Sequence, residues 1–269
     1  RPPRSTLFPY TTLFRSQIAV LAKQMVAEEV PMDTLSNEEL LYAATLTPSV
    51  EEKEKIYLIS IDKEDTWVAH ANLGAVYFDM AVDSEEEADM IDYMNKAVNQ
   101  LELSIKMGES AEAYATLAGI YAVQDKLSQA QEALDMGFSM NPSNEVREGL
   151  NAVKGYVNIK LANYGEAIAA LEIASPTPDN MFNKGLAQLL DEKYDQSIDS
   201  FDKVIEMDAD YGKAYYAAAV ASARKNDESG VVDYLSKAAS TDSEYAEMAI
   251  DDLVFADYAG SQAFQDAIK

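Results

Sequence analysis

After its first 16 residues, the chain carries apolar residues every three or four positions, and no stretch alternates apolar and polar residues as a strand does. This spacing puts the apolar side chains on one face of successive helices. The first predicted helix has its apolar stripe within residues 18–26 and ends before Pro31, because proline cannot continue a helix. The pattern therefore predicts an all-helical chain.

Two short helices are predicted next. Ser36 followed by Glu39 forms the S-x-x-E capping box that opens the segment SNEELLYAA. Pro48 precedes a second helical segment, EEKEKIYLI. Since only a tight turn over 46–49 separates the two, we expect them to form a helical hairpin.

A longer pattern then repeats with a period of about 34 residues. In the ideal pattern, a first helix has a bulky residue at position 4, Leu at 7, Gly or Ala at 8 and Tyr at 11. A second helix has Ala at 20, Phe or Leu at 24, a small residue at 27 and Pro at 32. The small residues let the two helices approach, and the large ones fill the gaps between them. The copy that starts at Ala111 is complete, with Tyr114, Leu117, Ala118, Tyr121, Ala130, Leu134, Gly137 and Pro142.

Four other copies are less regular. The earliest has an acidic insertion, DSEEEAD, between its two helices, and SPTPDN shortens the connection before a later copy. Ser197 stands where alanine is usual, and the last copy has Ser222 for Tyr and Val231 for Ala. The matching residues are His70, Leu73, Gly74, Tyr77, Ala97, Leu101 and Ser104; Gly155, Tyr164, Ala167, Leu171 and Ala174; Gly185, Tyr194, Phe201 and Val204; Tyr215, Ala218, Ala219, Leu235 and Ala238.

Over residues 65–245 this pattern resembles the tetratricopeptide-repeat (TPR) family. The resemblance implies an all-α fold, a right-handed α-α superhelix (solenoid) built from antiparallel helix pairs. We expect N-terminal helices with a degenerate hairpin over 17–64, about five repeats over 65–245 and a capping segment over 246–269. A solenoid needs such a cap because its last repeat otherwise exposes an apolar face.

The first 16 residues differ from the rest. Thr6–Ser16, TLFPYTTLFRS, resembles the in-frame translation of a sequencing adapter. We therefore interpret residues 1–16 as an assembly artefact. The alternative is a native arm of β-forming residues. With an artefact here, the native N-terminus, and any signal peptide, anchor or domain on it, is expected to be missing.

Charge and composition exclude several classes of function. Acidic residues outnumber basic ones 47 to 21, giving a net charge of −26, and this charge repels nucleic-acid phosphates and anionic membranes. No apolar run approaches the roughly 20 residues that span a bilayer. Because the chain has no cysteine, disulfides and thiolate chemistry are excluded.

The sequence offers little catalytic or metal-binding chemistry. Its single histidine, His70, occupies a packing position of the repeat. Asp208, Asp210 and Gly212 make only a fragment of a calcium loop, and no phosphate-binding glycine loop occurs. We expect no enzyme activity and no cofactor. The insertion acids suit a solvated, mobile bulge better than a cation site: Asp83, Glu85, Glu86, Glu87 and Asp89.

The family resemblance also implies a concave groove lined by the first helices. Its apolar and aromatic character, with bases toward the C-terminal end, suits an amphipathic helix or an extended peptide. Alternatively, the chain's own terminal segments fill the groove, or its residues only pack the helices together. Since Ala115 and Gly119 stand where some relatives have carboxylate-binding residues, that activity is not expected. The predicted groove residues are Ala71, Phe78, Ala115, Ala122, Tyr156, Ile159, Lys160, Phe182, Leu186, Leu189, Lys213, Tyr216 and Arg224.

We therefore predict a non-catalytic scaffold that binds a protein or peptide partner. The alternative is a repeat segment of a larger envelope structural or anchoring protein. The phrases NEELLYAATLTP, NLGAVY and DDLVFADY resemble envelope-associated repeat proteins of Gram-negative bacteria. This resemblance favours a periplasmic or outer-membrane-associated location over the cytoplasm. The partner, the compartment and the oligomeric state stay open.

Overall fold

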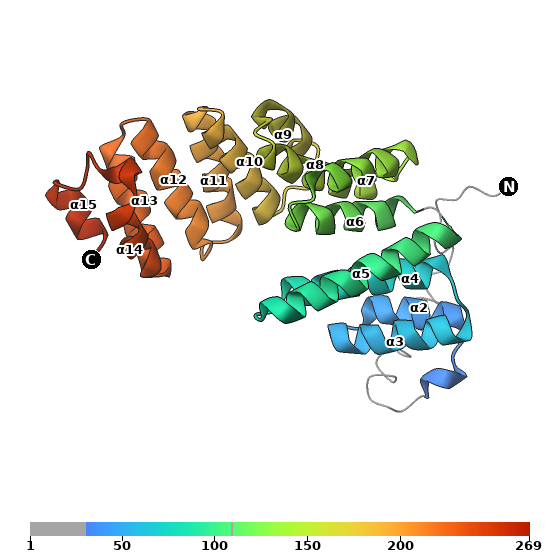
Figure 1. Cartoon of the computed structure of the whole chain (residues 1–269). Helices are drawn as coiled ribbons and strands as arrows, with labels where there is room; N and C mark the ends of the chain where they lie inside the picture. The colour runs from blue at the N-terminus through green and yellow to red at the C-terminus, as the bar shows by residue number, and fades with distance from the viewer. Residues whose placement is uncertain (1–30, 109) are drawn as a thin grey trace. The chain divides into compact units, whose positions relative to one another are not determined.

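The computed structural model describes residues 31–108 and 110–269, and every described element of regular structure is a helix. The predictions for residues 1–16 and for the helix over 18–26 lie outside the described residues. The chain divides into two compact units, Arg1–Arg147 (unit 1) and Glu148–Lys269 (unit 2). Each unit is built from helices that pack against their neighbours in the sequence (Figure 1).

Unit 1 is a succession of antiparallel helices. Helix α2 packs against α3, α3 against α4, α4 against α5, α5 against α6 and α6 against α7. The elements are η1 (Met32–Thr34), α2 (Asn37–Leu46), α3 (Val50–Lys63), α4 (Trp67–Val82), α5 (Glu87–Met107), α6 (Ala111–Val123) and α7 (Leu127–Ser139).

The predicted capping box opens α2. The Ser36 hydroxyl accepts a hydrogen bond from the backbone N–H of Glu39 at 3.3 Å, and the Glu39 carboxylate accepts one from the backbone N–H of Ser36 at 2.8 Å. These bonds satisfy two donors that the helix itself leaves unpaired. The bond from the Ser36 backbone also holds the pKa of Glu39 below its usual value.

The acidic insertion is partly helical, where the sequence suggested a solvated bulge. Only a short turn over 83–86 separates α4 from α5, and the rest of the insertion lengthens α5 to 21 residues. Glu87 and Asp89 lie in the first turn of α5. Acidic side chains are favourable there because the N-terminal end of a helix carries a partial positive charge.

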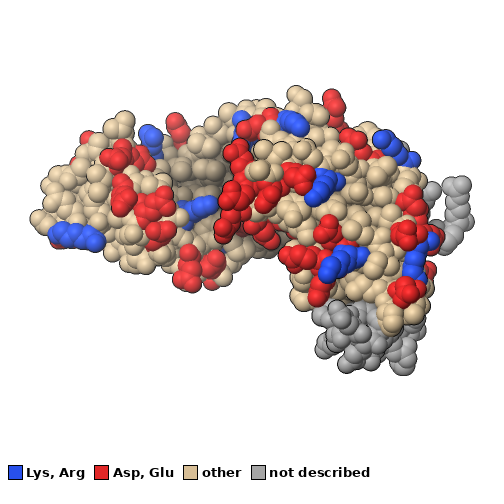
Figure 2. Space-filling model, turned by 60° about the horizontal axis from the view of Figure 1, so that its bottom comes forward, with Lys and Arg blue, Asp and Glu red and all other residues tan. Residues whose placement is uncertain are grey.

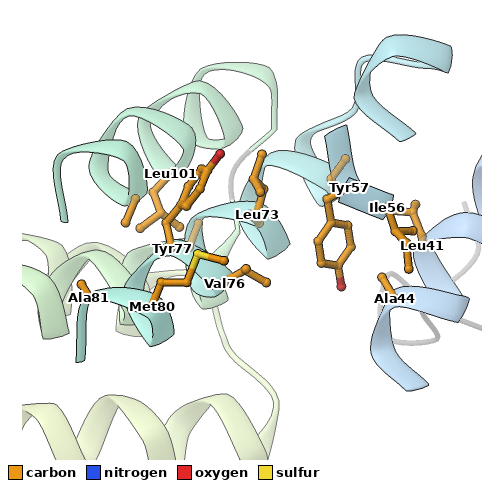
Figure 3. Close-up of a cluster of buried hydrophobic side chains, with 14 of the residues drawn as sticks. Leu41, Ala44, Ile56, Tyr57, Leu73, Val76, Tyr77, Met80, Ala81 and Leu101 are labelled. Carbon is orange, nitrogen blue, oxygen red and sulfur yellow. The ribbon is translucent and has the colours of Figure 1, made fainter. Parts of the chain in front are cut away.

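The core of unit 1 forms around α4 (Figure 3). Leu73, Val76 and Tyr77 of α4 lie between Leu101 of α5 and the apolar residues of α2 and α3 (Figure 3). Leu73 and Leu101 are fully buried. Apolar burial on both sides of α4 therefore joins the hairpin to the first predicted repeat.

Unit 2 continues the same pairing. Helix α10 packs against α9 and α11, α11 against α12, α12 against α13, and α13 against α14 and α15. Most of α8 (Asn144–Lys160) belongs to this unit. The other elements are α9 (Tyr164–Leu171), α10 (Pro178–Leu190), α11 (Tyr194–Met207), α12 (Gly212–Arg224), α13 (Glu228–Thr241), α14 (Glu244–Asp251), η2 (Leu253–Phe255) and α15 (Gln262–Ala267).

Small residues allow the two helices of a pair to approach, as the repeat pattern predicted. A Cβ atom added at Gly74 would lie 2.7 Å from the Cγ of Leu101, and one at Gly185 would lie 2.6 Å from the Cε1 of Phe201. Gly155 is equally close to Leu171. In all three pairs, the glycine at position 8 faces the large residue at position 24. The repeat pattern is thus a pattern of helix contacts.

In several helix pairs, the connection between the two helices contains a residue in the left-handed backbone conformation. Glu192 has φ 58° and Asn226 has φ 61°. After α10, the N–H of Lys193 bonds to the carbonyl of Gln188 at 2.8 Å, and the N–H of Glu192 bonds to that of Leu189 at 3.1 Å. This is the Schellman arrangement, which satisfies the last carbonyls of a helix and turns the chain sharply.

Candidate functional site

The predicted groove residues of unit 2 come from its first helices, α8, α10 and α12. Phe182, Leu186 and Leu189 share one face of α10, and each is half-buried. On α8, Ile159 is half-buried, and the ammonium of Lys160 lies 5.6 Å from the ring centre of the half-buried Tyr156. Lys160, Lys213 and Arg224 are exposed. These helices thus present partly exposed apolar side chains together with basic ones.

Phe182 is held by aromatic neighbours. Its ring centre lies 5.5 Å from that of Phe201 and 5.5 Å from that of Tyr211. Tyr211 is fixed in turn, because its hydroxyl donates to Asp179 at 2.7 Å. Since Phe201 is fully buried, a change at Phe182 would disturb the core as well as the surface.

Tyr216 contacts the C-terminal segment of the chain. Its hydroxyl donates to Asp252 at 3.0 Å, and its ring centre lies 5.7 Å from that of Tyr245 and 5.8 Å from that of Phe255. Phe255 and Phe264 are buried in the same apolar cluster. The chain's own terminal segment therefore engages this predicted groove residue, as the alternative interpretation describes.

In unit 1 the predicted groove positions contribute mainly to packing. Ala71 and Ala122 are buried, so they offer no surface to a partner. Phe78 is half-buried and packs against the core cluster, and Ala115 is half-buried. These residues are therefore not part of the peptide-binding surface that is proposed below.

His70 is also part of the packed interior. It is 6% exposed, and its Nδ1 and Nε2 atoms each lie 2.6 Å from an oxygen, of Gln100 and Asp65 respectively. Among residues 31–108 and 110–269, no three His, Asp or Glu side chains come together as a metal-binding group. The same part of the chain contains no helix that is both long enough and apolar enough to cross a membrane.

Comparisons with known proteins identify the fold. No protein-family model and no curated protein matches the sequence. Among solved structures, YrrB, described as a TPR protein with an unusual peptide-binding site, is 17% identical and has a TM-score of 0.53, over 69% of this chain and 92% of that chain. PilW, described as a widely conserved type IV pilus biogenesis factor, is 15% identical with a TM-score of 0.57, over 72% of this chain and 90% of that chain.

A third structure covers nearly the whole chain. In the Cut9–Hcn1 hetero-tetramer of the APC/C, the aligned chain is 12% identical with a TM-score of 0.69. The alignment spans 95% of this chain and 46% of that chain. Together with the repeated helix pairs, these likenesses decide the fold. The chain has the fold of tetratricopeptide-repeat proteins.

The second helices of the TPR pairs in unit 2 carry a feature that the sequence analysis missed. A cavity of about 430 Å³ opens between α11 and α13. Asp195, Asp199 and Asp202 are spaced to share one face of α11. This spacing was visible in the sequence, but carboxylate pairs are common by chance in so acidic a chain. The cavity lining also includes Asp227, Asp233, Ser222, Lys225, Tyr234 and Lys237.

Tyrosine hydroxyls connect elements within each of the two units. Tyr234 of α13 donates to Asp202 of α11 at 2.8 Å, and Tyr77 of α4 donates to Glu54 of α3 at 2.9 Å. Burial, followed by the hydrogen bond to the carboxylate, raises the pKa of Tyr234 and Tyr77 above the usual 10.0. The same causes raise the pKa of Tyr211 and Tyr216.

These raised values predict a loss of stability in alkali. Burial raises the pKa of Tyr57, which is 4% exposed, from 10.0 to about 12. Because the folded pKa exceeds the unfolded one, the stabilisation is complete below about pH 10 and is lost as the pH rises through the folded value. Between about pH 9 and about pH 11, Tyr57 alone should account for a loss of about 1 kcal/mol. The half-buried tyrosines should add less, because solvent screens them.

Urea unfolding at the two pH values measures this loss, and the phenolate absorbance follows the titration. Tyr57→Phe is the matched variant, because it keeps the ring and removes the titrating hydroxyl. Its loss between the two pH values should be smaller by about 1 kcal/mol. Identical losses in the two proteins would contradict the assignment to Tyr57.

Proposed function

We propose that the chain is a non-catalytic scaffold whose unit 2 binds a peptide of a partner protein along α8, α10 and α12. The observation that carries this proposal is the partly exposed apolar face of Phe182, Leu186 and Leu189 on α10. Partly exposed apolar residues on one helix face suit the apolar anchors of a helical or extended peptide. YrrB, which has the same fold, is described as having a peptide-binding site, and this supports the proposal.

The charges beside this apolar face indicate which charge the bound peptide should carry. The exposed Lys160, Lys213 and Arg224 belong to the same helices, whereas the molecule as a whole carries a net charge of −26. Figure 2 shows groups of Asp and Glu on one face of the molecule, with Lys and Arg scattered among them. A peptide with apolar anchors and flanking acidic residues would therefore be attracted locally and repelled elsewhere, which favours specific binding.

A displayed library of random peptides tests this function. The wild-type chain should enrich peptides that combine apolar residues at helical spacing with acidic residues. A Leu186→Glu, Leu189→Glu variant should bind the enriched peptide at least about tenfold more weakly, because it places charge on the apolar contact surface. Phe182 and Tyr216 are left unchanged, since both are engaged in packing.

Leu190→Glu is the matched control, because Leu190 is 43% exposed at the end of the same helix. This variant should keep the wild-type affinity, and circular dichroism should show equal helicity in all three proteins. Equal affinity of the wild type and the double variant would contradict the proposed surface. The envelope alternative stays a hypothesis, and a lipobox or a further globular domain in the complete gene would favour it.

A further inference from the structure

A second surface lies mainly on the second helices of unit 2, and no predicted groove residue lines it. The cavity of about 430 Å³ between α11 and α13 has no groove residue in its lining. Five aspartates and two lysines line it, so its walls carry an excess of negative charge. The surface is therefore formed by other residues than the proposed peptide groove, although α12 contributes to both.

Some of these charges are already engaged. The ammonium of Lys225 lies 2.5 Å from the Asp195 carboxylate, and the Tyr234 hydroxyl donates to Asp202. Asp227 accepts the backbone N–H of Gly230 at 3.1 Å and so caps α13. These contacts hold α11, α13 and the end of α12 in place around the cavity.

The remaining charges are available to a ligand. Within the described residues, neither Asp199 nor Asp233 has a hydrogen-bond or ion-pair partner, and both are exposed. Lys237 does not neutralise them by an ion pair: its ammonium lies over the rings of Tyr215 and Tyr234, 5.9 Å from each ring centre. Asp199 is attracted by the nearby Lys225 ammonium, but neither carboxylate makes a direct ion pair in the described part of the chain.

A buried hydroxyl without a partner lies at the wall of the same cavity. Ser222 of α12 is fully buried and lines the cavity, yet its Oγ has no hydrogen-bond partner among the described residues. Buried polar atoms are normally paired, so an unpaired one calls for a ligand or a water. Gly230 lies directly against this hydroxyl, since a Cβ atom there would lie 2.6 Å from the Ser222 Oγ.

We propose that this cavity binds an arginine side chain from a basic segment of a partner protein. A guanidinium has five donors in a planar fork, which suits carboxylates on two helices and a hydroxyl acceptor better than a lysine ammonium does. A bare metal ion fits poorly, because no three acidic or imidazole side chains of the described chain form a metal-binding group.

The test uses the full chain and a fluorescein-labelled tetra-arginine peptide, with a tetra-lysine peptide as the charge-matched probe. Fluorescence anisotropy at physiological salt should show at least about fivefold tighter binding of tetra-arginine, because only a guanidinium is held by paired hydrogen bonds. Asp199→Asn with Asp233→Asn should weaken tetra-arginine binding about tenfold and remove most of this preference. Equal binding of the two peptides by the wild type would overturn the proposal.

Two further variants separate the cavity from general charge attraction. Glu85→Gln with Glu86→Gln removes the same charge from exposed sites in unit 1 and should leave the tetra-arginine affinity unchanged. Ser222→Ala keeps the charge and removes the unpaired hydroxyl, so it should weaken tetra-arginine binding about threefold without lowering helicity. An equal loss in the Glu85, Glu86 variant, or an unchanged affinity in Ser222→Ala, would refute a site at this cavity.

Discussion

Replacing Phe201 with alanine is expected to lower the free energy of unfolding of unit 2 by about 3–5 kcal/mol. Phe201 is fully buried between α10 and α12, and its ring lies against Phe182. The facing residue is Gly185, which has no side chain to move into the space that the ring leaves. The cavity would therefore persist, and the loss should lie in the upper part of the range for core aromatics.

Urea unfolding followed by circular dichroism measures this loss. Met207→Ala is the control, because Met207 is 48% exposed at the end of the same helix. It should cost less than about 1 kcal/mol, since its side chain is only partly removed from water. A loss below about 1 kcal/mol for Phe201→Ala would contradict the role assigned to this ring.

The contact between Gly185 and Phe201 could be predicted from the sequence, as could the two equivalent glycine contacts. The two residues are close in the chain and belong to neighbouring helices of one pair. A short connection leaves such helices one way to bury their apolar faces, so the spacing of small and large residues fixes the contact. The capping box at Ser36 was predictable for the same reason, because all its atoms lie within one helical turn.

Features that depend on contacts between more distant segments could not be predicted. The sequence placed Tyr216 on a groove face, but its burial depends on Tyr245 and Phe255 in the C-terminal segment. The cavity with the Ser222 hydroxyl requires α11, α12 and α13 together. Periodicity gives the face of a helix on which a residue lies, but it does not give what covers that face.

The sequence also did not predict the left-handed turns, because glycine is absent from them. Glu192 and Ala162 both adopt φ 58° at the ends of first helices, a conformation that favours glycine. Neither residue signals a left-handed turn, and the hydrogen bonds of the Schellman arrangement hold them there. Likewise, the acidic insertion gave no sign that it would extend α5, because charged residues suit both loops and exposed helix faces.

Replacing Gly185 with valine is expected to destabilise unit 2 by about 3 kcal/mol, the upper part of the range for overpacking. The added Cβ would lie 2.6 Å from the Cε1 and 2.8 Å from the Cδ1 of Phe201. Real Cβ atoms do not approach so closely, and the fully buried ring has no free space into which to move. The helices must therefore separate, which weakens the packing of α10 against α11.

Gly149→Val is the matched control, because nothing lies within 4 Å of a Cβ atom added at Gly149 of α8. This change should alter the stability by less than about 1 kcal/mol, since valine is a better helix former than glycine. The decisive measurement is a double-mutant cycle between Gly185→Val and Phe201→Ala. The double variant should be about 2–3 kcal/mol more stable than the sum of the single losses predicts. The reason is that Phe201→Ala opens the space that the valine side chain at position 185 fills. Losses that add to within about 0.5 kcal/mol would mean that the two positions do not share a contact.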